Sequence, residues 1–408
     1  MSFRLFLVCS FFLLGRPQDI LTFLQPARPT LVLTILAMGT MVFGGHRKEL
    51  SAALSMPESK RYLLFYLIMI VGIPFASHRG LAFQGVFVTY IVNVLFFVLL
   101  VSQVTSLQRL KSLVWVICIS TVTYSVFGGL LQSGSGGDGR FQVSGSAFDA
   151  NDTAYVLLSL FPLCLYFIRF DDGMLKKLVA IAAVFSAIAV VLATGSRGGI
   201  LGLGTVLLVL LLTKTGGIKT SHKVFLVVML ASTFLLMRDR IDVDRYLALS
   251  DVSSDYNVSS EGGRIELWQS AVDLSLANPI TGVGVECYPF AHLRARQLAG
   301  ESFLRWQYTH NSFLQVATEV GLAGFAVFVL INLRSLFTFL RISRIRIEPE
   351  AREASEIRVL GGLMLLGFAG LLVSGFFLSQ GYSIFSTLYF ALAAATVRLQ
   401  ATLRAEAV

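Results

Sequence analysis

Long apolar runs recur from one end of this sequence to the other, and they constrain its fold more than any other feature. A run of about 20 apolar residues is long enough to cross the hydrocarbon core of a bilayer as a helix. Hydrophobic residues make up 55% of the 408-residue chain and charged residues only 14%, a balance that no soluble globular domain requires. We therefore expect an all-α fold, a polytopic bundle of membrane helices.

The apolar runs predict about twelve transmembrane helices. The first run imitates a signal peptide because Arg4 precedes a short apolar core, but no small-x-small cleavage site follows, and we interpret it as an uncleaved span. Pro17, Pro26 and Pro29 interrupt the region after it, which predicts an irregular or re-entrant entry into the membrane. The spans are expected near residues 3–14, 30–44, 62–76, 84–104, 112–131, 153–168, 178–193, 198–212, 224–237, 312–340, 359–378 and 383–397.

The Lys and Arg residues of the short loops predict how the bundle is oriented, because cytoplasmic loops carry an excess of them. With the amino terminus inside, 20 fall on the cytoplasmic side and only five in the short outer loops, at Arg16, Arg28, Arg79, Arg140 and Arg197. Both termini are therefore expected in the cytoplasm. The net charge of +9 comes from scattered rather than clustered residues, so no nucleic acid partner is expected.

One long outer loop divides the chain. Residues 1–237 contain the first nine predicted spans, residues 238–311 form the loop, and residues 312–408 contain the last three spans and a cytoplasmic tail. A loop of this length between packed elements is usually functional or disordered. We do not expect disorder, because residues 263–279 have the pattern of an amphipathic helix.

The amphipathic helix has Ile265, Trp268, Val272 and Leu276 on one apolar face, and Pro279 follows its end. Such a helix can lie flat on the membrane, with its tryptophan at the depth of the lipid headgroups. It can also cap the helical bundle. The two placements are compatible.

Two arginines beside glycines are candidates for binding a phosphate on the outer face. Arg197 lies at a predicted hairpin tip in ATGSRGG (193–199), and Arg264 begins the amphipathic helix behind two glycines. Exposed N–H groups at a helix start and the fork of an arginine both suit phosphate oxygens. Either arginine can instead belong to a plain turn and extend to the headgroups. Arg79 in SHRGLAFQG is a weaker candidate, for which this second role is favoured.

His310 is the histidine best placed for catalysis, because it stands directly before the predicted tenth span. A neutral imidazole at the membrane surface can take a proton from a hydroxyl near pH 7. The alternative is a histidine that only caps the helix or lies at the interface. Ser312 and Gln315 resemble a capping box, which predicts that His310 precedes the helix and faces outward.

Two further polar positions could support such a centre. Glu319 lies roughly 13 Å into the tenth span at 1.5 Å per residue, where a charge costs about 2.5–3.5 kcal/mol on insertion scales. We expect it to face the bundle interior, as the partner of an Arg or of a backbone group. In FDANDTA (148–154), Asp149, Asn151 and Asp152 open the sixth span, where they can cap the helix or bind sugar hydroxyls.

Several classes of site have no support in the sequence. It contains no GxxxxGK[ST] stretch, no HExxH and no Cys/His cluster, so neither nucleotide hydrolysis nor tightly bound zinc is expected. The four cysteines show no CxxC spacing, and we infer neither a disulfide framework nor a metal site. No cofactor is expected. An outward-facing site without ATP needs a substrate that carries its own activation, as a diphosphate-linked lipid does.

Four stretches make the chain resemble the O-antigen ligase and polymerase superfamily of bacterial inner-membrane glycan transferases. The predicted layout of twelve spans and one large periplasmic loop is similar as well, and the resemblance covers most of the chain from about residue 140 to 340. The stretches are TGSRGGILGL (194–203), GRIELWQSAVDLSLANPITGVG (263–284), THNSFLQVATEVGLAG (309–324) and, more weakly, FDANDTA.

The resemblance implies a membrane glycosyltransferase of the bacterial inner membrane that needs no metal. It would move a glycan from undecaprenyl diphosphate to an acceptor hydroxyl on the periplasmic face, with membrane lipids around it. Arg197 and Arg264 would bind the donor diphosphate, and His310 would activate or orient the acceptor hydroxyl. The supporting positions would be Glu319, Arg79 and Asn151.

The acceptor separates the members of this superfamily. It is a lipid A core sugar for a ligase of lipopolysaccharide synthesis and another repeat unit for an O-antigen or exopolysaccharide polymerase. The spacing from His310 to Gly321 matches a motif associated with ligases, and polymerases have similar stretches. A single large outer loop, where several polymerases have two Arg-rich ones, favours the ligase. A lipid-linked oligosaccharide flippase is the rival class, but transporters place their sites near the midplane, where only Glu319 lies.

Overall fold

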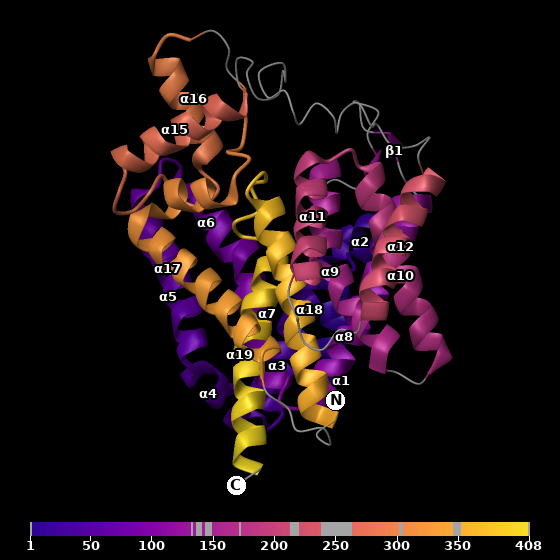
Figure 1. The fold of residues 1–408 in the computed structure, drawn as a ribbon. Coiled ribbons are helices and arrows are strands. Elements are labelled where there is room, and N and C mark those ends of the chain that lie inside the picture. The colour runs from indigo at the N-terminus through magenta and orange to yellow at the C-terminus, as the bar shows by residue number, and fades with distance from the viewer. Residues whose placement is uncertain are drawn as a thin grey trace.

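The chain folds into a helical bundle whose two termini lie on the same side (Figure 1). The computed structural model describes residues 2–131, 134–135, 141–142, 149–170, 173–212, 220–237, 263–301, 305–345 and 352–406. Within these residues the only strands are β1 (Gly134–Ser135) and β2 (Phe141–Gln142), which pair antiparallel. The all-α prediction is confirmed. Residues 238–262 of the predicted large loop lie outside the described residues.

The first half of the chain supplies most of the bundle. Its elements are α1 (Ser2–Leu14), α2 (Pro17–Ile20), η1 (Thr22–Ala27), α3 (Pro29–Phe43), α4 (Arg47–Ser55), α5 (Pro57–Gly72), η2 (Ile73–Phe75), α6 (Arg79–Gln84), η3 (Gly85–Tyr90), α7 (Ile91–Gln103), α8 (Leu107–Val122), η4 (Thr123–Leu131), α9 (Ala150–Phe170), α10 (Met174–Ala193), α11 (Arg197–Leu212) and α12 (Thr220–Met237). The second half adds α15 (Arg264–Ala277), α16 (Tyr288–Leu298), α17 (Ser312–Ser343), α18 (Arg352–Gly375) and α19 (Ile384–Glu406).

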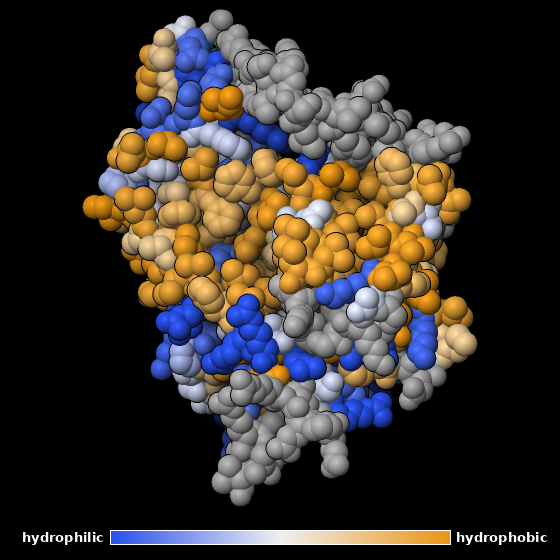
Figure 2. Space-filling model, in the orientation of Figure 1, coloured by the Kyte–Doolittle hydropathy of each residue, from blue (hydrophilic) through white to orange (hydrophobic). Residues whose placement is uncertain are grey.

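Helices α15 and α16 sit at the end of the bundle opposite the two termini (Figure 1). We call these two ends the capped side and the terminal side. Figure 2 shows apolar residues in a belt around the middle of the visible face, with hydrophilic residues above and below it. A belt of this kind is the surface that a bilayer requires.

Seven helices of the described residues are long and apolar enough to span a membrane, which confirms a polytopic membrane protein. Helices α3 and α4 together form a further apolar pair that is bent by 106°. The count of twelve stays a prediction, because three apolar helices, within α1, α11 and α12, are shorter. The seven long spans are Arg79–Gln103, Leu107–Gly128, Ala150–Phe170, Met174–Ala193, Ser312–Ser343, Arg352–Gly375 and Ile384–Ala401.

The prolines near the amino terminus break the chain as predicted. Pro17 and Pro29 each occupy the first turn of a helix, where the missing N–H costs nothing. The residues before them, Arg16 and Arg28, have left-handed backbone angles with φ of 48° and 44°. The chain therefore turns sharply on both sides of the short segment that contains α2 and η1.

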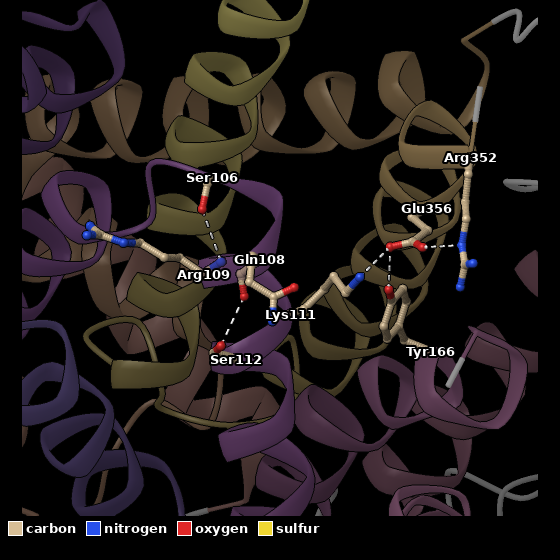
Figure 3. A network of polar contacts seen from close by, with 8 residues as sticks. All are labelled: Ser106, Gln108, Arg109, Lys111, Ser112, Tyr166, Arg352 and Glu356. Atoms are coloured by element: carbon tan, nitrogen blue, oxygen red, sulfur yellow. Dashed lines mark hydrogen bonds and ion pairs between the residues drawn. The ribbon is translucent and has the colours of Figure 1, made fainter. Parts of the chain in front are cut away.

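A buried carboxylate ties three helices together at the terminal side (Figure 3). The Glu356 side chain, at the start of α18, is only 4% exposed. It accepts hydrogen bonds from Lys111 Nζ of α8 at 2.9 Å, Tyr166 Oη of α9 at 2.7 Å and Arg352 Nε at 3.2 Å. Because α18 runs from this network to the capped side, the network fixes the far end of a helix that leads to the site.

Candidate active site

A polar cavity of about 480 Å³ lies where α9, α17 and α19 begin and α18 ends. Six separate segments of the sequence contribute to its walls. Its polar lining contains two basic and three acidic side chains together with amides and hydroxyls. The lining residues are Arg16, Thr89, Asn93, Asp149, Asp152, Glu286, Tyr308, His310, Gln315, Leu378, Ser379, Gln380, Tyr382, Ser383 and Ile384.

His310 lines this cavity with its backbone in the left-handed region, at a φ of 49°. Its N–H donates to Ser379 Oγ at 2.9 Å, and Ser379 Oγ is also 3.0 Å from Thr309 Oγ1. A non-glycine residue in this region is strained, and such strain persists only where neighbours enforce it. The contacts to Ser379 supply that enforcement.

The start of α17 differs from the predicted capping box. Asn311 caps the helix, because its Oδ1 accepts from the N–H groups of Phe313 at 2.9 Å and Leu314 at 3.0 Å. Ser312 and Gln315, which were predicted to form the box, bind the loop between α18 and α19 instead. Ser312 Oγ donates to the carbonyl of Leu378 at 2.7 Å, and Gln315 Oε1 accepts from the N–H of Gly381 at 3.1 Å. The prediction that His310 precedes the helix is confirmed.

The surroundings of His310 favour a neutral imidazole. Burial lowers the pKa of His310, the nearby charge of Arg264 lowers it further, and Asp149 opposes both effects. A neutral ring has a free nitrogen lone pair, so it can accept a proton from a hydroxyl. The same electrostatic effect indicates that Arg264, at the start of α15, lies near His310.

The loop of residues 376–383 connects the candidate residues. The sequence predicts a helix to residue 378 and a linker at 379–382, but α18 ends at Gly375 and a longer loop follows. Phe376 contacts the ring of Trp268 in α15, with centroids 5.6 Å apart. A side chain at Gly198, next to Arg197, would lie 3.2 Å from Phe377 Cβ, so the turn that begins α11 packs directly on this loop.

The amino end of α9 forms another wall of the cavity. Asp149 Oδ1 accepts from the N–H groups of Asn151 at 2.7 Å and Asp152 at 2.9 Å, so it caps the helix. Asp152 Oδ1 accepts from Gln380 Nε2 at 2.8 Å, which joins α9 to the loop. Asn151, the residue selected from the sequence, binds Asp149 through its side chain and is not part of the lining.

Helix α17 is broken at Gly321, whose φ of 73° and ψ of 174° are not helical. A side chain there would collide with the carbonyl of Ile280, so only glycine fits. At the break, the N–H of Leu322 donates to the carbonyl of Pro279 at 2.8 Å, and the carbonyl of Thr318 accepts from the N–H of Val283 at 2.8 Å. The segment between α15 and α16 thus takes over backbone hydrogen bonds that α17 gives up.

Glu319 anchors the same segment with its side chain. It is 1% exposed, its Oε2 accepts from the N–H of Glu286 at 3.0 Å, and its Oε1 accepts from the N–H of Tyr288 at 3.1 Å. Its partners are thus backbone groups. Glu319 itself does not line the cavity, but Glu286 does.

The three arginines selected from the sequence occupy different places. Arg197 and Arg264 begin α11 and α15, and neither lines the cavity. Arg79 is exposed at the start of α6, where its Nε donates to the carbonyl of Pro74 at 3.0 Å. The structure therefore brings the turn of Arg197 and the start of α15 to the loop beside His310, and it leaves Arg79 apart from them.

Arg16 and Glu286 line the cavity although the sequence did not single them out. Arg16 Nε is 2.5 Å from Asp19 Oδ2. The sequence marks a turn near each of them, through Pro17 beside Arg16 and through Gly282 and Gly284 before Glu286. Neither feature shows which distant segments meet at the cavity.

Helix α15 packs on α17 with a face that its hydrophobic periodicity does not indicate. Its buried residues are Leu267, Ala271 and Ser275, and Ser275 Oγ is 2.9 Å from Thr318 Oγ1 of α17. The predicted apolar residues Ile265, Val272 and Leu276 are instead exposed. The helix thus caps the bundle and also presents an apolar stripe that suits a membrane surface.

An apolar cavity of about 610 Å³ lies between α10, α11 and α12. Its lining residues on α11 follow Arg197 along the same helix. The walls consist of Leu192, Ile200, Leu203, Gly204, Leu207, Val227, Leu230, Ala231, Phe234 and Leu235.

In the part of the chain that the structure describes, no three His, Cys, Asp or Glu residues gather as metal ligands would.

These features define a polytopic α-helical membrane protein with a polar cavity at its capped side. Residues 181–329 match the family model described as O-antigen ligase. This match confirms the resemblance to the O-antigen ligase superfamily that the sequence motifs indicate. The matched segment includes Arg197, Arg264 and His310.

One relative is an uncharacterized protein of Haemophilus influenzae. It is 28% identical over 177 residues, an alignment that covers 39% of this chain and 44% of the relative. The chain thus aligns with less than half the length of this relative.

Proposed function

We propose that the protein transfers a glycan from undecaprenyl diphosphate to an acceptor hydroxyl, as an O-antigen ligase does. The observation that carries this proposal is the placement of His310. It lines a polar cavity in an enforced left-handed conformation, and the charge of Arg264 is close enough to lower its pKa. A neutral base in a polar cavity beside a cation suits a reaction in which a hydroxyl loses a proton and an anion leaves.

The charges of the cavity fit a sugar better than a diphosphate. Three carboxylates, those of Asp149, Asp152 and Glu286, face it against Arg16 and His310. Carboxylates accept hydrogen bonds from hydroxyls but repel phosphate oxygens. We therefore assign the cavity to the glycan and the acceptor, and the diphosphate to the helix starts outside it.

Arg197 and Arg264 are the proposed ligands of the diphosphate. Each begins a helix, where N–H groups and the helix dipole favour an anion. The apolar cavity along α11 starts one turn after Arg197, at Ile200. A polyprenyl chain in this cavity would bring its diphosphate to Arg197, so the arrangement supports a lipid-linked donor.

The proposed reaction is a direct displacement. The acceptor oxygen bonds to the anomeric carbon while the bond from that carbon to the diphosphate oxygen breaks. The acceptor proton passes to the imidazole of His310, and the lipid diphosphate leaves as an anion beside the arginines. Fixed cations that face the developing charge lower the barrier. We propose that this step requires no metal ion.

A repeat-unit polymerase is the second candidate, because the same residues would serve an acceptor that is another lipid-linked glycan. A flippase is less well supported, since the polar cavity lies at the capped side rather than at mid-membrane. We place the terminal side in the cytoplasm and the cavity on the periplasmic face of the inner membrane. The charge bias of the loops supports this orientation.

The decisive experiment is the His310→Ala substitution in a strain that lacks the chromosomal gene. Transfer should be abolished while the protein still inserts and is expressed normally; full activity would refute the role of His310. Gels of lipopolysaccharide and exopolysaccharide from the deletion strain identify the acceptor. An unmodified lipid A core indicates a ligase, and single repeat units indicate a polymerase.

A further inference from the structure

Glu286 has a backbone conformation that its residue type does not favour. Its φ is 62°, in the left-handed region where glycine is the usual residue. Two neighbouring glycines, Gly282 and Gly284, also have positive φ values, of 68° and 100°. Three residues of this short segment thus have left-handed backbone angles. The first two are glycines, and the third, Glu286, has a carboxylate side chain.

Another carboxylate holds this turn in place. The Glu319 oxygens accept the N–H groups of Glu286 and Tyr288, and the carbonyl of Glu319 accepts the N–H of Gly284 at 3.0 Å. All of these bonds use the backbone of the turn. The conformation of Glu286 is therefore fixed independently of its own side chain.

The side chain of Glu286 extends into the cavity wall. A side chain at Gly85 would meet Glu286 Cγ at 3.0 Å, so the stem of the glutamate lies directly against η3. Thr89 of η3, Asn93 of α7 and Tyr382 line the cavity with it. Segments of π-helix such as η3 often occur at functional sites.

The carboxylate of Glu286 lacks a protein partner. Among the residues that the structure describes, no hydrogen bond or ion pair reaches its oxygens. The other two acids of the cavity are engaged, since Asp149 caps α9 and Asp152 binds Gln380. A partly buried carboxylate in a strained position with unused acceptor capacity is arranged for a ligand rather than for stability.

We propose that Glu286 is a specificity-determining residue that accepts hydrogen bonds from the hydroxyls of an uncharged sugar and rejects sugars that carry a carboxylate. This inference rests on the proposed glycan transfer, because it assigns the substrate class of the same cavity. A uronic acid would bring a second negative charge beside Glu286, and unpaired like charges are strongly unfavourable in a partly buried site.

The test measures sugar binding separately from transfer. Full-length protein in nanodiscs is examined by saturation-transfer difference NMR with methyl β-D-glucopyranoside and methyl β-D-glucopyranosiduronic acid, which differ at one carbon. The buffer is set at pH 8, because burial raises the pKa of the Glu286 carboxyl. The wild type should bind the glucoside at least about tenfold more tightly than the glucuronide.

Two variants isolate the carboxylate. Glu286→Gln keeps the shape and removes the charge, and Glu286→Gly suits the backbone angle and keeps the N–H bond to Glu319. Both should reduce the discrimination to less than about threefold, and Glu286→Gly should not lower the melting temperature. Glu353→Gln, at an exposed position on the terminal side, is the matched control and should discriminate as the wild type does.

The proposal is overturned if the wild type binds both glycosides equally or neither of them, or if Glu286→Gly keeps the preference. These outcomes differ from a failure of the proposed function. If discrimination is absent but His310→Ala still abolishes transfer, only the role of Glu286 fails. If discrimination is present but His310→Ala transfers glycan normally, the sugar site stands and the acceptor-activation role fails.

Discussion

Ser379 Oγ accepts the backbone N–H of His310 at 2.9 Å, and this contact joins the loop after α18 to the segment before α17. The two residues are 69 positions apart in the sequence. The contact fixes a histidine in a left-handed conformation without using its side chain. The imidazole therefore remains available to the cavity while its backbone is held rigidly.

We predict that Ser379→Ala lowers transfer by about one to two orders of magnitude while costing only about 1 kcal/mol of stability. The loss of the hydrogen bond would let His310 relax from its left-handed conformation, and the imidazole would no longer face the acceptor. Initial rates and melting temperatures of the purified protein measure the two effects. Ser335→Ala, which removes only a bond within α17 at 2.9 Å, is the control. Equal rates for both variants would contradict the prediction.

We predict that transfer loses activity on acidification with a midpoint below the usual histidine pKa of about 6.5. Burial and Arg264 lower the pKa of His310, so the neutral, active form predominates above that lowered value and disappears as the pH falls through it. Rates at saturating donor give the profile.

The flanking charges provide the check on this pH profile. Arg264→Gln should move the acidic limb to higher pH, because it removes a positive charge that disfavours the protonated ring. Asp149→Asn should move the limb to lower pH, because it removes a negative charge that favours protonation. A profile that neither substitution shifts would show that another group titrates.

The sequence predicted the helices of this fold but not the points where they break. Hydropathy identifies an apolar run, and α17 has one from Ser312 onward. The break at Gly321 depends on the carbonyl of Ile280, which reaches it from another segment. Likewise, α18 ends at Gly375 although Phe376, Phe377 and Leu378 continue the apolar run.

Prediction of the candidate site was limited in the same way. His310 and the acids at the start of α9 could be selected because each has a local signal, such as a polar triplet before an apolar run. For Arg16 and Glu286 the nearby proline and glycines indicate only a turn, and their role depends on which distant segments meet at the cavity. Glu319 was expected at a buried position, and its two backbone partners could be identified only from the fold.

We predict that Glu319→Ala destabilises the protein by about 1–3 kcal/mol, because it leaves the N–H groups of Glu286 and Tyr288 without acceptors. Glu319→Gln should cost less, since its single amide oxygen can still accept one of the two bonds. Thermal unfolding in detergent and limited proteolysis between α15 and α16 measure the effect. A Glu319→Ala protein as stable as the wild type would show that this carboxylate does not hold the turn.

We predict that the network around Glu356 stabilises the bundle without taking part in the chemistry. Glu356→Ala leaves the Lys111 ammonium and the Tyr166 hydroxyl without their acceptor, and we expect a cost of about 1–3 kcal/mol. Arg352→Ala should cost less than about 1 kcal/mol, because the Arg352 side chain is 71% exposed and its ion pair is screened by solvent.

Unfolding midpoints and transfer rates per folded molecule distinguish this role from a catalytic one. Because the network lies at the opposite end of α9 and α18 from the loop of Ser379, the folded fraction of Glu356→Ala should transfer glycan at the wild-type rate. A lower rate at normal stability would instead mean that the terminal side communicates with His310 through these helices.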